Sequence, residues 1–137
     1  MGYFKYIGIC IEEVHYELTI GKEKFDCSQF FGDLTRNNFY KLKQFLLTEE
    51  TSKSLYLDLS YNPEIDMKIE VLETGYLGTF EDDDEGDHYE FHLDEAFFRD
   101  YLKMIQRIEG EAKRHAIASY KTNYYEISDL LKQVYNE

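Results

Sequence analysis

Alternating apolar and polar residues dominate the first part of the chain and predict β-strands. Residues 3–11 carry apolar side chains on both faces of an extended segment, which favours a central strand. A one-sided strand is expected at 14–20. A glycine turn then leads to a short return strand at 24–27, with Phe25 and Cys27 facing inward. The chain is therefore predicted to open with an antiparallel meander.

The middle of the chain switches from a period of two to helical spacing and back. After a loop at 28–34, Thr35 is a suitable N-cap for a helix over 36–49, whose apolar positions recur three and four residues apart. Strands are predicted again at 55–61, where leucines alternate with polar residues, and at 67–72. The turn between them is Asn62-Pro63-Glu64, because proline cannot donate to a ladder. Gly75 and Gly78 could then mark a bulge or a bend.

Two helices are predicted in the last third of the chain. Asp94 can cap a long helix, Gly110 is expected to end or kink it, and a weaker continuation is expected over 111–121. Asn123 and Glu126 have the spacing of a capping box for a final helix. These C-terminal helices either fold back on the sheet or form a homodimer, and exposed apolar residues on 123–137 would favour the dimer.

This order of elements predicts one α+β domain over residues 1–137. We expect a mostly antiparallel sheet of about five to six strands, packed against one central helix and two C-terminal helices. The length suits a single core, and the 23 Tyr and Phe side chains exclude disorder.

The strongest compositional feature is an acidic tract at residues 81–90. It holds seven carboxylates and no Lys or Arg, and so contributes −7 of the formal net charge of −13. Strand patterns on both sides predict that the tract forms the tip of a hairpin. Tyr76 and Tyr89 would provide aromatic residues beside it. The candidate partner-binding residues are Glu81, Asp82, Asp83, Asp84, Glu85, Asp87 and Glu90, with Tyr76 and Tyr89.

Charge and composition limit the classes of partner that this chain is expected to bind. A pI near 4.7 argues against direct binding to nucleic acid or to an anionic membrane, and favours a basic protein. No apolar run approaches a membrane span, and the first residues lack the cleavage region of a signal peptide. With Lys outnumbering Arg 11 to 4, an AT-rich source such as a low-GC bacterium or its phages is favoured. We therefore expect a cytoplasmic protein of a bacterial or phage-infected cell.

No catalytic or metal-binding motif stands out. Cys10 and Cys27 are expected to be reduced structural thiols, and no Ser lies in a nucleophile-elbow motif. Aligned as a calcium loop, the acidic tract has His92 where a bidentate Glu is required. His88 and His92 are about 13 Å apart along a strand, too far to share one zinc by themselves. Adding His15, Asp87 and Glu90 would permit a metal site only if the fold brought these residues together. We expect no catalytic residue, no metal and no cofactor.

The acidic tract has two interpretations. Its carboxylates could imitate the charge spacing of a nucleic-acid strand and occupy a basic surface, or they could form a solvated turn that keeps the chain soluble.

In size, acidity and lack of catalytic motifs, the chain resembles the small protein inhibitors of bacteria and phages. These include phage anti-CRISPR and other anti-defence proteins, and immunity proteins that neutralise toxins. The resemblance implies a non-catalytic inhibitor that occupies a basic, nucleic-acid-binding surface of an effector or nuclease. The alternatives are an immunity protein that masks a toxin by aromatic contacts, and a small enzyme or metal-dependent module.

Overall fold

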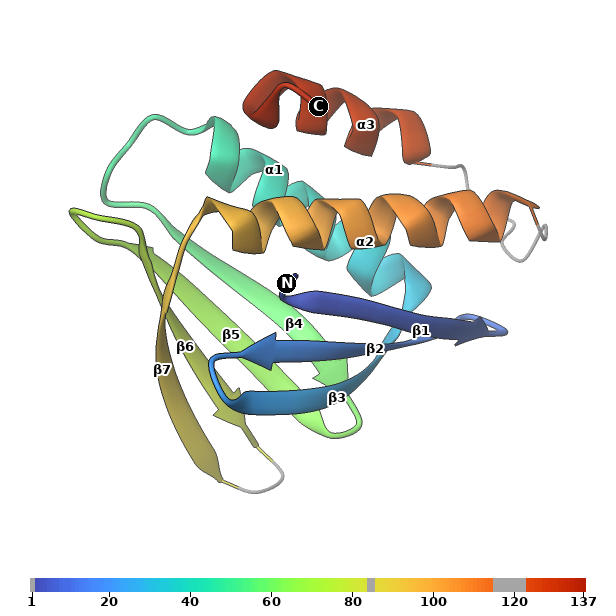
Figure 1. Ribbon diagram of the computed structural model, residues 1–137, viewed down its shortest axis with the longest axis horizontal. Helices are drawn as coiled ribbons and strands as arrows, with labels where there is room; N and C mark the ends of the chain where they lie inside the picture. Colours follow the sequence, from blue (N-terminus) through green and yellow to red (C-terminus); the bar gives the residue numbers. More distant parts are fainter. Residues whose placement is uncertain (1, 84–85, 115–122) are drawn as a thin grey trace.

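The computed structural model describes residues 2–83, 86–114 and 123–137, and over these residues the fold is α+β. Two antiparallel sheets and a set of helices enclose one buried core, to which both sheets and all the helices contribute (Figure 1). The first sheet contains β1 (Phe4–Cys10), β2 (Glu13–Ile20) and β3 (Glu23–Phe30). The second sheet contains β4 (Ser54–Tyr61), β5 (Glu64–Val71), β6 (Tyr76–Asp82) and β7 (Asp87–Leu93). The helical elements are η1 (Asp33–Asn38), α1 (Phe39–Leu47), α2 (Glu95–Arg114) and α3 (Tyr124–Tyr135).

The expectation of one sheet with five to six strands was wrong, since the described residues form seven strands in two sheets. The sheets meet at β3 and β4, where side chains take the place of a backbone ladder. Ser60 Oγ accepts a hydrogen bond from Ser28 N at 3.0 Å and donates to Ser28 O at 3.1 Å. The register shifts between Asp58 and Ser60, and Ser60 is buried while Tyr61 is exposed. This irregularity ends the alternation predicted for residues 55–61 two residues early.

The first strand lies at a sheet edge and is not central. Its register against β2 shifts between Tyr6 and Gly8, and Ile11 in the following turn is 82% exposed with a φ of 58°. Phe4 packs against Phe97 of α2, with ring centroids 5.1 Å apart. The strand is therefore apolar on both faces for two reasons. Some of its apolar side chains pack against α2, and others are exposed.

The first helical segment starts earlier than its predicted cap. Thr35 is buried within η1 and donates its hydroxyl to Phe31 O at 2.9 Å, a bond made four residues back inside a helix. The segment expected to be a loop at 28–34 instead extends β3 to Phe30 and then turns helical. Burial of Phe31 and Leu34 outweighs the capping preference of Thr35.

The long helix α2 begins as predicted. Asp94 Oδ1 accepts a hydrogen bond from Ala96 N at 3.1 Å. The apolar stripe of the helix is buried, and its residues are Phe98, Tyr101, Leu102, Ile105 and Ile108. Gly110 does not end the helix, which continues to Arg114. A Cβ at Gly110 would lie 3.4 Å from Tyr124 Cε2, an ordinary van der Waals contact, so the packing of α3 at this point does not require glycine. The continuation predicted over 111–121 lies outside the described residues from 115 onward.

The last helix folds back on the domain, as Figure 1 shows, with α3 lying along α2 on the side away from the sheets. Ile127, Leu130 and Leu131 are buried against the domain, so this stripe is not available for a homodimer, whereas Tyr125 of the same helix is 64% exposed. The capping-box interpretation was wrong, because Asn123 makes no side-chain cap bond. Its amide instead donates to Thr35 O at 2.9 Å.

We expect Asn123→Ala to destabilise the fold by about 1–3 kcal/mol, because the buried carbonyl of Thr35 loses its partner. Urea denaturation would measure the change. Asn37→Ala is the matched control: it removes an exposed amide bond to Asp33 and should cost no more than about 0.5 kcal/mol. Equal losses in the two variants would show that Asn123 does not anchor α3.

Candidate protein-binding surface

The acidic tract forms the tip of the β6–β7 hairpin, as predicted. The two strands pair without a register shift from Tyr76 and Leu93 to Asp82 and Asp87. Gly86 N donates to Asp82 O at 2.7 Å, and Gly86 has a φ of 71°, which suits glycine. Asp84 and Glu85 lie outside the described residues.

The two tyrosines chosen from the sequence have different positions. Tyr89 lies near the tip, where its hydroxyl donates to Asp87 Oδ2 at 3.3 Å. Tyr76 is at the other end of β6, about 20 Å from the tip, and donates to Glu95 Oε1 at 2.6 Å. The prediction that both flank the tip is therefore wrong for Tyr76. Spacing in the sequence could not show that the strand runs straight through Gly78.

A row of carboxylates crosses the outer face of the second sheet. Asp58 of β4 lies opposite Asp66 of β5, Asp66 lies opposite Glu81 of β6, and Glu81 lies opposite His88 of β7. Neighbouring strands are about 4.8 Å apart, so these like charges are close. Like charges directly opposite each other reduce stability. The fold therefore holds an acidic surface at a cost to its own stability.

A second group of carboxylates connects this row to the tip. Acceptor atoms of Glu64, Asp66 and Asp83 all lie within 4.8 Å of one another, and Asp83 N donates to Glu64 O at 3.0 Å. Glu64 and Asp83 are exposed and Asp66 is partly buried. We call Asp58, Glu64, Asp66, Glu81, Asp83 and Glu90 the acidic face. Asp82 and Asp87 lie at the hairpin tip on the opposite face of the strands.

The proximity of these groups changes their titration. Partial burial, a hydrogen bond to Asp83 and the charges of Asp58, Asp83 and Glu64 raise the pKa of Asp66 to about 6. Burial and the charge of Asp33 raise the pKa of Asp58, while Lys41 and a hydrogen bond from Gln29 oppose the rise. Each proton or cation that approaches this surface is therefore attracted by several carboxylates together.

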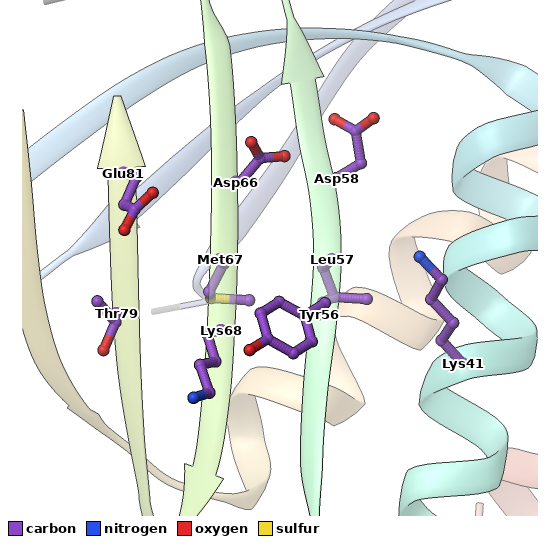
Figure 2. Close-up of a pocket in the computed structure, with 9 residues that line it drawn as sticks. All are labelled: Lys41, Tyr56, Leu57, Asp58, Asp66, Met67, Lys68, Thr79 and Glu81. Atoms are coloured by element: carbon purple, nitrogen blue, oxygen red, sulfur yellow. The ribbon is translucent and has the colours of Figure 1, made fainter. Parts of the chain in front are cut away.

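The acidic face borders a groove of about 400 Å³. Figure 2 shows Asp58, Asp66 and Glu81 on adjacent strands, with Tyr56 and Lys68 further along the same face and Lys41 on the neighbouring helix. Lys68 Nζ lies 5.6 Å from the centre of the Tyr56 ring and 3.7 Å from Glu70. The groove is therefore acidic toward the hairpin tip and cationic at its other end. The residues that line it are Lys41, Tyr56, Leu57, Asp58, Asp66, Met67, Lys68, Thr79 and Glu81.

We expect Asp66→Asn to stabilise the protein at neutral pH. Because the pKa of Asp66 is raised from 3.8 to about 6, the folded protein binds this proton more readily than the unfolded chain, and stability falls as the pH rises through this interval. Removing the charge should restore about 1 kcal/mol at pH 7 after allowance for solvent screening. Thermal denaturation across this pH range would measure the difference, which should vanish near pH 4. Lower stability of the variant at pH 7 would contradict the repulsion.

The other candidate groups from the sequence remain apart. His15 lies on β2, within 3.0 Å of Ser28 Oγ, whereas His88 and His92 are exposed on β7 in the other sheet. Among the described residues they form no cluster able to hold a metal. Burial raises the pKa of the Cys27 thiol to about 12, which keeps it protonated. Cys27 is buried, as expected of a structural thiol, whereas Cys10 is exposed.

Comparisons with known proteins identify no relative. No family model matches the chain, no curated protein matches its sequence, and no solved structure matches its fold. Over the described residues, the helices are too short or too polar to cross a membrane. The acidic face therefore has to be interpreted from its own geometry.

Proposed function

We propose that this protein is a non-catalytic inhibitor whose acidic face occupies a basic, nucleic-acid-binding surface of another protein, as phage anti-CRISPR and other anti-defence proteins do. The observation that carries the proposal is the cross-strand row of Asp58, Asp66 and Glu81, which continues onto the hairpin tip. The partner would be an effector or nuclease in a bacterial or phage-infected cell.

The arrangement of charge supports recognition over solvation. A solvating loop needs only separate exposed charges, whereas these carboxylates lie opposite one another on three strands at the expense of stability. Carboxylates recur about 4.8 Å apart across the strands, and Glu81 and Asp83 are about 6.6 Å apart along the chain. A protein surface that binds the phosphates of a nucleic acid through Lys and Arg could bind these carboxylates, because their spacing is similarly dense.

The sequence of the hairpin adds to this argument. Residues 76–93 contain seven carboxylates and no Lys or Arg, so the hairpin carries a strong net negative charge. Such a field accelerates encounter with a basic protein and makes the association sensitive to salt. The strands hold the acidic face in place, so little ordering is needed on binding.

Affinity capture tests this function. The immobilised protein is incubated with lysate of a low-GC bacterium, and captured proteins are identified and then challenged with double-stranded DNA and with salt. The proposal predicts a basic nucleic-acid-binding protein that DNA displaces and that a variant with Glu81→Gln, Asp82→Asn, Asp83→Asn and Asp87→Asn does not retain. A captured protein that DNA leaves bound, and that the variant also retains, would refute it.

A second candidate, an immunity protein, is favoured by an exposed aromatic pair. Phe30 and Tyr61 are 45% and 39% exposed, and their rings stack with centroids 4.7 Å apart. Exposed aromatic side chains are common anchors at protein interfaces. This candidate predicts a complex that resists salt and is lost in Phe30→Ser. The DNA and salt challenges therefore separate the two functions.

A further inference from the structure

In the described part of the chain, the two sheets have four edges, and three of them are protected. The edges of β3 and β4 face each other and are bridged by Ser28 and Ser60. At β1, the register shift interrupts the edge, Tyr3 N donates to Asp100 Oδ2 of α2 at 2.9 Å, and Arg107 lies 5.0 Å above the ring of Tyr6. Bulges and covering helices are common means by which proteins block edge-to-edge pairing.

Among the residues that the structure describes, none provides such a protection at the edge of β7. Within the described residues β7 pairs only with β6, and Figure 1 shows it at the outer margin of the sheet. Its register is regular over all seven residues, and the strand contains no Pro, Gly or Lys. No described backbone hydrogen bond joins residues 87–93 to any element other than β6. A row of backbone donors and acceptors is therefore available for another strand.

We propose that β7 binds an extended basic segment of the partner by β-strand addition. This inference rests on the proposed function and specifies how the partner engages the hairpin. Backbone hydrogen bonds would supply affinity and the alternating side chains of β7 would supply selectivity.

The side chains of β7 suit a basic segment. On the outer face Glu90 lies between His88 and His92, all exposed, and would pair with Lys or Arg. On the other face, Asp87 precedes Tyr89 and Phe91, whose rings lie nearly parallel with centroids 6.1 Å apart. Both rings are partly exposed. They offer surface for aliphatic stems or for a stacked guanidinium group.

The same charges disfavour a second copy of this chain at the edge. Glu90 is the central residue of β7, so antiparallel pairing of two copies about its centre would place Glu90 against Glu90. Like charges directly opposite are destabilising. A basic segment removes this repulsion, which is why we assign the edge to it.

A pair of peptide probes tests the inference. One probe is an extended peptide of alternating Lys and Thr, labelled for fluorescence anisotropy at low salt. The other has the same sequence with every backbone amide N-methylated, so that its charge is retained and its donors are lost. We expect the unmethylated probe to bind at least about tenfold more tightly, and to protect the amides of residues 87–93 from hydrogen exchange.

The outcomes separate this inference from the proposed function. Equal binding of the two probes, without protection of 87–93, would overturn strand addition and leave electrostatic binding intact. Failure of both probes to bind would overturn both. Glu90→Lys should weaken binding of the unmethylated probe more than Glu49→Lys does. Glu49→Lys makes the same charge change at a site outside the hairpin. Equal effects of these substitutions would also overturn strand addition.

Discussion

Neutralising Glu64, Asp66, Glu81 and Asp83 together, as Gln and Asn, is expected to weaken binding of the alternating Lys-Thr peptide by about 100-fold at low salt. Each of these carboxylates contributes to one contiguous field, and a loss of roughly 0.7 kcal/mol per charge gives this factor. Fluorescence anisotropy would measure the change. Folding should be retained, because Glu64, Glu81 and Asp83 are exposed and the loss of repulsion around Asp66 is stabilising.

A variant with the same change in net charge provides the control. Glu49, Glu50, Glu73 and Asp129 are exposed and lie outside the acidic face. Their neutralisation should weaken peptide binding by no more than about threefold, because these charges lie outside the acidic face and Coulomb attraction falls with distance. If both fourfold variants lose affinity equally, net charge controls binding and the acidic face is not a specific site.

Phe80→Ala is expected to destabilise the protein by about 3–5 kcal/mol. Phe80 is fully buried on β6, and its ring stacks on Phe25 of the first sheet with centroids 5.8 Å apart and an angle of 8° between the planes. It also contacts Phe91 of β7 edge-to-face. One side chain therefore joins the two sheets and supports the hairpin that carries the acidic tip. Urea denaturation would measure the loss.

The matched control for this prediction is Tyr56→Ala. Tyr56 is an aromatic residue on a strand of the same sheet, but it is 58% exposed, and its removal should cost less than about 1 kcal/mol. A similarly small loss in Phe80→Ala would show that the sheets do not pack through this side chain. In folded Phe80→Ala protein, weaker peptide binding would show that the core fixes the geometry of the acidic face.

The elements predicted correctly are those with a regular hydrophobic period. The strand with Val14 and Tyr16 inward and the helix capped by Asp94 depend on local spacing, and local spacing is visible in a sequence. The errors occur where tertiary contacts determine the role of a residue. Thr35 has the residue type of a cap but lies inside a helix, and Asn123 uses its side chain to hold a distant carbonyl. Neither role can be predicted from the residues next to Thr35 or Asn123 in the sequence.

The candidate site was predicted only in part. The hairpin tip followed from the acidic run and its flanking strands, but Asp58, Glu64 and Asp66 were not singled out. A signal did exist, because these acidic residues lie on both sides of the Asn62-Pro63 turn and a hairpin brings them together. Which residues lie opposite depends on the irregularity between Asp58 and Ser60, where Ser60 is hydrogen-bonded to Ser28 of β3.

The central claim is that a basic partner binds the acidic face, and amide chemical-shift mapping by NMR tests it most directly. The labelled protein would be titrated with the alternating Lys-Thr peptide at low salt. We predict perturbations concentrated at Asp58, Glu64–Lys68, Thr79–Asp83 and Gly86–Leu93, with little change along α2 and α3. Perturbations spread evenly over the surface, or centred on the helices, would contradict the claim.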